Sequence, residues 1–158
     1  MSQQITSSNL VPATESKNIV MNVLTLIIKK KWLDEILSGE KTTEEREIRP
    51  NSSHKYFYYK NCATGEIYKR GIDIPDDVFG GESNVPIDFM YHQYDAIQFW
   101  AGYETNRPGV LVEIKGFEHF TIEDDNGDAI TYEYTDGRTY CMAAIEYQLG
   151  KVLNKTNC

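Results

Sequence analysis

Short runs of apolar, β-branched and aromatic residues recur along this chain, and their spacing limits the folds open to it. Val23 to Ile28 reads VLTLII and Gly109 to Phe117 reads GVLVEIKGF, and both runs have the length and composition of buried strands. Further strand-like runs lie at 41–48, 56–60, 66–70, 94–100, 130–134 and 140–149, and we expect the charged run at 41–48 to be exposed. The runs at 56–60 and 66–70 flank Ala63-Thr64-Gly65 and predict a hairpin-like pair. The 11 Tyr, 6 Phe and 2 Trp also favour strands over helices. We therefore expect a mainly β fold.

One helical stripe interrupts this pattern, directly after the first strand-like run. Its apolar members, all on one face of a short helix over 29–38, are Trp32, Leu33, Ile36 and Leu37. Gly39 follows, and glycine is the usual residue in the left-handed conformation that ends a helix. Many short strands with one early helix predict an α+β, mainly β domain, built as a small, partly open β-barrel with one or two short helices.

The length of 158 residues suits one domain. Residues 1–20 are polar and rich in Ser, Thr, Gln and Asn, so we expect a flexible N-terminal leader before a domain at 21–158. Within that domain, residues 71–92 contain Pro75, Gly80, Gly81 and Pro86 among scattered acids. We expect a long irregular insertion there, of the kind that often forms a lid or a binding loop.

Charge is distributed unevenly along the chain. The net charge is −8, which argues against a protein that coats nucleic acid by bulk attraction. Residues 1–70 hold 11 Lys and Arg against 8 Asp and Glu, a sum of +3, whereas residues 71–158 hold 5 against 16, a sum of −11. The acidic half would repel phosphates and confine any nucleic acid to a face of the first half.

The cysteines and histidines indicate the compartment and the cofactors. Three widely spaced cysteines without a CxxC pair fit free thiols in a reducing compartment, so we expect a cytoplasmic protein. No run is long enough for a transmembrane helix, and the N-terminus lacks a signal-peptide pattern, so we expect no membrane partner. The three histidines make no metal-ligand spacing with cysteine, and we predict no metal and no cofactor.

The segment from Gly39 to Arg46 reads GEKTTEER, and five of its eight residues carry a formal charge. A half-buried strand would show apolar alternation, but no aliphatic residue occurs before Ile48. The composition fits two interpretations equally: an edge strand protected by charges, or a strand that lines a wet functional cavity.

The order of residues in this segment is more specific. Gly39-x-Lys41-x-x-Glu44-x-Arg46 matches the GxKxxExR signature of the ASCH family. An apolar strand and a short helix precede it, and YDAIQFWAGY, VLVEIKGF and IEYQLGKVL follow in the order of the remaining ASCH strands. The chain therefore resembles this family over roughly 23–153.

The resemblance implies a PUA-like fold, a small β-barrel with one or two helices beside a cleft, and such domains commonly bind RNA or modified bases. Some ASCH proteins are ribonucleases, and a small bacterial group removes the acetyl group from N4-acetylcytidine. The catalytic lysine of that group matches Lys41 and its arginine matches Arg46, but its threonine falls where this chain has Glu44. Its later glutamate has no clear counterpart here, so the resemblance favours binding over catalysis.

Elementary chemistry gives each motif residue a hypothetical role. Lys41 could hold a phosphate or act as a catalytic base, and Glu44 could accept from an exocyclic amine or serve as a general base. Arg46 offers a planar fork for a phosphate or a face for base stacking. Thr43 lies among them as a further ligand-binding candidate. The alternative for Glu44 and Arg46 is a salt bridge that orders the barrel.

Other residues could support such a site. Arg49 and Lys55 would extend a basic rim, and Trp100 and Tyr103 bracket a strand end as a stacking platform. Glu113, between apolar neighbours, could supply a second carboxylate. For all five, ordinary packing or solvent exposure is the competing interpretation.

Three functions remain open at this point. The first is binding of RNA or a modified nucleoside or nucleotide through a charged cleft at the GxKxxExR motif. The alternative is a nucleic-acid-related hydrolase, either a ribonuclease or an amidohydrolase on modified nucleosides such as N4-acetylcytidine, that uses the same cleft. The second alternative is a protein-interaction domain whose acidic half docks a basic partner. The sequence predicts no particular oligomeric state.

Overall fold

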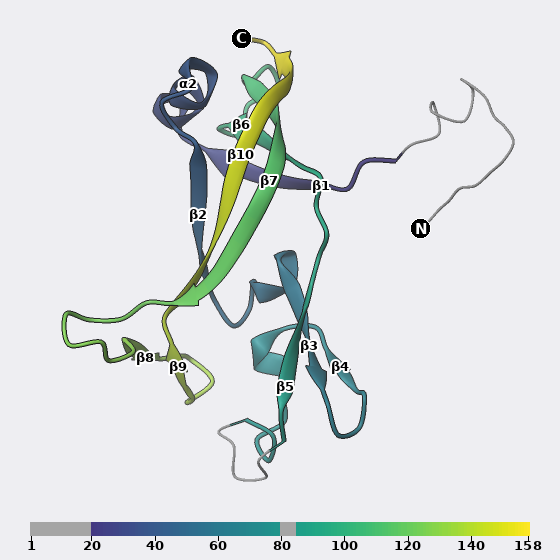
Figure 1. Ribbon diagram of the computed structural model, residues 1–158, viewed down its shortest axis with the longest axis vertical. Coiled ribbons are helices and arrows are strands. Elements are labelled where there is room, and N and C mark those ends of the chain that lie inside the picture. The colour runs from purple at the N-terminus through teal and green to yellow at the C-terminus, as the bar shows by residue number, and fades with distance from the viewer. Residues whose placement is uncertain (1–19, 80–84) are drawn as a thin grey trace, which may run out of the picture.

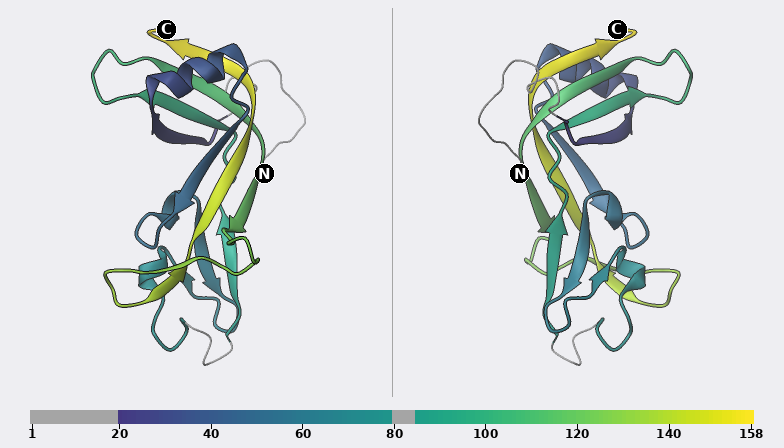
Figure 2. Two further views of the ribbon diagram at one scale, coloured as in Figure 1. Left: turned by 90° about the vertical axis from the view of Figure 1, so that its left-hand side faces the viewer. Right: turned by 90° about the vertical axis from the view of Figure 1, so that its right-hand side faces the viewer.

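The computed structural model describes residues 20–79 and 85–158, and Figures 1 and 2 show an elongated molecule organised around long strands. Its elements are β1 (Val23–Ile28), α2 (Lys30–Ser38), β2 (Thr43–Ile48), η1 (Ser53–Lys55), β3 (Phe57–Asn61), β4 (Ile67–Tyr68), η2 (Gly71–Asp73), β5 (Ile87–Tyr91), β6 (Ala96–Ala101), β7 (Gly109–Thr121), β8 (Thr131–Glu133), β9 (Thr139–Cys141) and β10 (Ala143–Thr156). The expected mainly β class is confirmed. The expected leader lies outside the described residues, apart from its last position. Within the described ranges, no helix is both long and apolar enough to cross a membrane.

The larger sheet has five strands in the order β1-β6-β7-β10-β2. β1 runs parallel to β6, and the other neighbouring pairs are antiparallel. β1 and β2 are therefore the two edges, and no backbone ladder joins them. The expectation of a barrel is corrected, because the sheet is not closed by pairing of its edge strands. A side chain links the two edges instead: Nη2 of Arg46 on β2 donates a hydrogen bond of 2.8 Å to the carbonyl of Ile27 on β1.

The predicted helix is confirmed as α2, which packs over one end of the larger sheet (Figure 1). Leu33 and Ile36 of its apolar stripe are buried. Gly39 ends the helix at φ 85°, in the left-handed region, and its amide donates to the carbonyl of Ile36 at 3.2 Å. Trp32 departs from the sequence interpretation, because it belongs to the stripe but stays 38% exposed.

The core lies on the inner face of the larger sheet, where alternate side chains of each strand point. Its members on the four strands β1, β6, β7 and β10 include Leu24, Leu26, Ile28, Ile97, Phe99, Val110, Val112, Ile145 and Tyr147. Each large side chain buried in this way stabilises the fold by about 1.5–3 kcal/mol. The same inner face carries Glu44 and Arg46 of β2, so the apolar core holds the charged motif in place.

A three-stranded sheet in the order β4-β3-β5 and a separate β8–β9 hairpin lie at the other end of the molecule (Figures 1 and 2). The predicted pairing of 56–60 with 66–70 is confirmed by β3 and β4. The expectation of an irregular segment throughout 71–92 is wrong at β5, which pairs with β3 along its whole length. β5 holds this position because Phe89 and Tyr91 pack edge-to-face on Phe57 at 5.1 and 5.6 Å between ring centroids.

The strand expected over 140–149 is two strands. Met142 separates them, because its amide donates to the carbonyl of Ile130 and its carbonyl accepts from the amide of Ile122. β9 therefore pairs with β8, whereas β10 leaves to join β7 and β2 and continues to Thr156. The long strands β7 and β10 connect the two ends of the molecule (Figure 1).

Candidate functional site

The connection between α2 and β2 sets the position of the charged motif. After the left-handed turn at Gly39, the amide of Lys41 donates to the carbonyl of Glu35 at 3.0 Å and ties the chain back onto the helix. One residue later, the carbonyl of Thr42 accepts from the amide of Leu149 at 2.9 Å, where pairing with β10 begins. Lys41 is thereby held between the helix and the edge of the sheet.

Lys41, Glu44 and Arg46 converge on one cluster, which we call the charged triad. Oε1 of Glu44 lies 3.0 Å from Nζ of Lys41, and Oε2 lies 2.6 Å from Nε of Arg46. The Glu44 side chain is 8% exposed, compared with 21% for Lys41 and 26% for Arg46. Two cations therefore hold one covered carboxylate, and the triad presents a net positive charge through the more accessible groups.

Arg46 is also a structural residue. Its Nε engages Glu44, while its Nη2 reaches the backbone of Ile27 across the opening between the two edge strands. The salt bridge considered as an alternative role is thus present, and the planar guanidinium serves two partners at once. The expectation of an exposed charged strand is wrong for Glu44, because the alternation of β2 turns Glu44, Arg46 and Ile48 inward.

Tyrosines close the inner side of the triad. Tyr147 on β10 stands opposite Glu44 in the strand register, and its ring centroid lies 6.4 Å from that of Tyr56. Burial raises the pKa of Tyr147 far above its ordinary value. Burial also raises the pKa of Tyr56, against an opposing effect of Arg46 and with a supporting effect of Glu44. Both phenols therefore stay protonated at neutral pH, and the triad faces neutral rings rather than further anions.

Trp32 is the residue that the sequence interpretation missed. Its half-exposed ring lies 4.6 Å from Nζ of Lys31 and 5.7 Å from Nζ of Lys41, measured to the ring centroid. An accessible indole close to two ammonium groups is suited to stacking on a base while the ammoniums meet a phosphate. The sequence signal for this site is the run of three lysines that directly precedes Trp32. Three positive charges at the start of a helix oppose its macrodipole, which suggests that they serve a purpose other than helix stability.

The other predicted binding residues lie away from the triad. Thr43 points to the outer face of β2, opposite Glu44. Arg49 pairs with Glu47 at 3.2 Å and lies over the ring of Tyr132.

Trp100 and Tyr103 also take no part in the triad. Trp100 alternates with the inward-facing Phe99, and its ring packs under the guanidinium of Arg107 at 4.7 Å. Tyr103 is 83% exposed in the turn after β6. The expected stacking platform therefore does not adjoin the charged motif.

Two further residues considered as support are also placed elsewhere. The carboxylate of Glu113 accepts from the amide of Lys151 at 3.3 Å on the outer face of β7, next to the buried Val112, so it does not join Glu44. Lys55 in η1 is exposed, and its carbonyl accepts from Oη of Tyr94 at 2.6 Å.

Comparisons with protein families, with curated proteins and with solved structures found no match for this chain.

Proposed function

We propose that this protein binds RNA or a modified nucleotide at the surface formed by Trp32, Lys41 and Arg46, as an ASCH-like domain of the PUA-like type. The observation that carries the proposal is the covered Glu44 carboxylate held between two partly accessible cations, next to a half-exposed indole. A planar, anionic ligand matches this combination, because the ring offers stacking and the cations offer charge-assisted hydrogen bonds.

Each residue has a distinct role in the proposal. Trp32 stacks on the base, while Lys31 and Lys41 flank its ring and meet the phosphate. Glu44 is a positioning residue: it is covered, and each of its oxygens already has a cation, so it orients Lys41 and Arg46 rather than contacting the ligand. The pairing of both Glu44 oxygens favours binding over the hydrolase alternative, because Glu44 would need a free oxygen to transfer a proton.

Tryptophan fluorescence tests the proposal directly. The chain has two tryptophans, so the variant Trp100→Phe leaves Trp32 as the only reporter. In this background, cytidine 5′-monophosphate, N4-acetylcytidine and a short single-stranded RNA are titrated at two salt concentrations. We expect saturable quenching, with weaker affinity for the two phosphate-bearing ligands at the higher salt concentration.

Matched charge changes identify the surface that binds. Lys41→Met is expected to weaken nucleotide binding about fivefold to twentyfold, since one charge-assisted contact is lost. Lys69→Met removes the same charge from an exposed residue after β4 and should change affinity less than twofold. Equal effects of the two variants, or absence of quenching by all three ligands, would overturn the proposal. Formation of cytidine from N4-acetylcytidine in the wild type but not in Lys41→Met would favour the hydrolase instead.

A further inference from the structure

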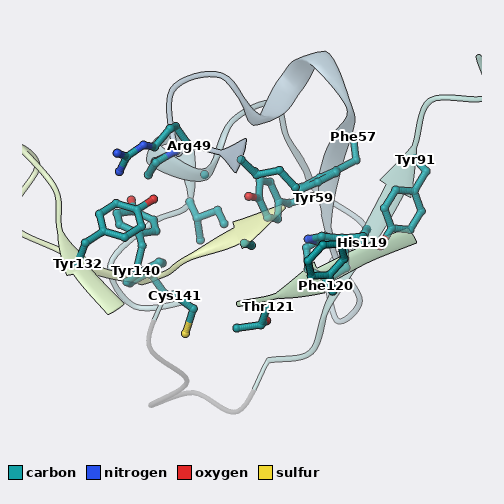
Figure 3. Close-up of a pocket in the computed structure, with 17 residues that line it drawn as sticks. Arg49, Phe57, Tyr59, Tyr91, His119, Phe120, Thr121, Tyr132, Tyr140 and Cys141 are labelled. Atoms are coloured by element: carbon teal, nitrogen blue, oxygen red, sulfur yellow. Dashed lines mark hydrogen bonds between the residues drawn. The ribbon is translucent and has the colours of Figure 1, made fainter. Parts of the chain in front are cut away.

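A second, chemically different site lies at the opposite end of β2 from the charged triad. A cavity of about 410 Å³ opens between the β3–β5 sheet, the ends of β7 and β10, and the β8–β9 hairpin. Figure 3 shows the side chains that line it. This volume lies within the range of roughly 300–1,000 Å³ that is typical of small-molecule sites. Lys41, Glu44 and Arg46 are not among the described residues that line the cavity, so an inference about one site does not depend on the other.

Aromatic rings form the walls of the cavity. On one side, Phe57 packs edge-to-face with Tyr59, Phe89 and Tyr91 at centroid distances of 5.1–5.6 Å. On the other side, Tyr132 and Tyr140 of the β8–β9 hairpin stack at 6.1 Å. Rings that hold one another in this way present flat, rigid surfaces, and such surfaces favour a planar ligand.

The charge of the cavity differs from that of the protein around it. Most lining residues belong to the acidic half of the chain, yet no Asp or Glu is among the described residues that line the cavity. Among the described lining residues, Arg49 is the one permanent cation, and its guanidinium lies 4.6 Å from the centroid of the Tyr132 ring. Its Nε also pairs with Glu47 at 3.2 Å, outside the lining, and the Glu47 side chain is 40% exposed and can turn towards water. The cavity therefore disfavours a cationic ligand and offers an anion one partner at its rim.

His119 adds a neutral polar group to the wall. Its Nδ1 shares a hydrogen bond of 2.8 Å with Oη of Tyr91, and its ring centroid lies 4.9 Å from that of Phe57. Burial lowers the pKa of His119, so the imidazole is neutral at pH 7 and brings no second charge.

We propose that this cavity binds a planar aromatic or heteroaromatic monoanion, with its rings between the aromatic walls and its carboxylate or equivalent acidic group on Arg49. The rigid rings determine the shape of the ligand, and the volume limits its size. The sign of its charge follows from Arg49 and from the lack of Asp and Glu among the lining residues that the structure describes. Nucleotide binding at the triad neither requires nor excludes such a ligand.

The free cysteines provide a direct measurement. Cys62, Cys141 and Cys158 are all exposed, but only Cys141 is among the described residues that line the cavity. The rate of alkylation of each cysteine by iodoacetamide is measured by peptide mass spectrometry at increasing concentrations of 2-naphthoate. We expect saturable protection of Cys141 and unchanged rates at Cys62 and Cys158. Absence of protection up to the solubility limit, or equal slowing of all three, would overturn the proposal.

Three ligands of similar shape but different charge test whether the cavity prefers an anion. 2-Naphthoate should protect Cys141 better than the neutral 2-naphthamide, and both should exceed the cationic 2-naphthylmethylammonium. In Arg49→Gln, affinity for 2-naphthoate should fall about threefold to tenfold, a moderate loss because the Arg49 side chain is 45% exposed. Affinity for 2-naphthamide should stay within twofold. Preference for the ammonium compound, or equal losses for anion and amide, contradicts the assignment of the anion to Arg49.

A second pair of variants tests the aromatic wall. Phe89→Ala removes a wall ring that is 38% exposed, and we expect affinity for both 2-naphthoate and 2-naphthamide to fall about fivefold or more. Ile67→Ala changes a 48% exposed residue on β4, in the same sheet but outside the lining, and should leave both affinities within twofold. Far-ultraviolet circular dichroism confirms that each variant is folded. Equal effects in the two variants would refute the site.

Discussion

Replacing Glu44 by glutamine tests the central feature of the fold, a covered carboxylate with one cation on each oxygen. Glutamine keeps the size of the side chain but removes the charge, which leaves Lys41 and Arg46 facing a neutral amide. Removing one partner of a buried ion pair costs about 3–5 kcal/mol. Lys41 and Arg46 are 21% and 26% exposed and can turn partly towards water, so we expect a loss of roughly 2–4 kcal/mol. For a chain of this length, that loss lowers Tm by roughly 5–15 °C.

The matched control is Glu45→Gln, the same change one residue further along β2. Glu45 is exposed on the outer face, so the free energy of unfolding should change by less than about 0.5 kcal/mol. Urea unfolding followed by circular dichroism gives both values, and unchanged m-values would show that the two states compared remain the same. If Glu44→Gln costs no more than Glu45→Gln, the carboxylate is neither covered nor doubly paired, and the reasoning fails.

Two further perturbations probe local features. Gly39→Ala should lower the free energy of unfolding by about 1 kcal/mol in urea titrations, since φ is +85° and an added Cβ meets no atom within 4 Å; an unchanged midpoint would refute the left-handed cap. Burial lowers the folded-state pKa of His119 below the ordinary 6.5. The contribution of the neutral His119 to folding stability is therefore complete above pH 6.5 and is lost as pH falls through the folded-state pKa. Between pH 7 and pH 5, His119→Phe should therefore lose less free energy of unfolding than the wild type. Part of the pH dependence should remain, because burial also lowers the pKa of His54. Identical pH profiles of the two proteins would contradict this expectation.

Local patterns predicted local structure well. The VLTLII strand and the helix that ends at Gly39 occur where the residues indicate, because both depend on periodicity and on one glycine conformation. The hairpin of β3 and β4 follows in the same way from its Ala-Thr-Gly turn. The sequence did not indicate that Met142 would divide a continuous strand-like run. That division depends on hydrogen bonds to Ile122 and Ile130, which lie earlier in the chain.

The site was predicted in part. The motif spacing drew attention to Lys41, Glu44 and Arg46, and the structure brings these three together. Polarity suggested that the strand is exposed, but pairing among the three charges allows Glu44 to be covered. The contact of Arg46 with Ile27 joins strands at opposite edges of the sheet, and no local pattern reports such a contact. The aromatic cavity was missed because its described lining comes from seven separate strands and from the segments between them.

The place of β2 in the sheet has a consequence for the timing of folding. Within the described sheet, β2 has a single neighbour, β10, and the pairing joins residues about a hundred positions apart, from Ile48 with Ala143 to Thr43 with Gln148. Contacts at such separation form slowly, because a long loop must close before they can stabilise anything. During refolding, the covering of Glu44 and any ability to bind a ligand at the triad should therefore arise in the same step as the docking of β10, however early α2 forms.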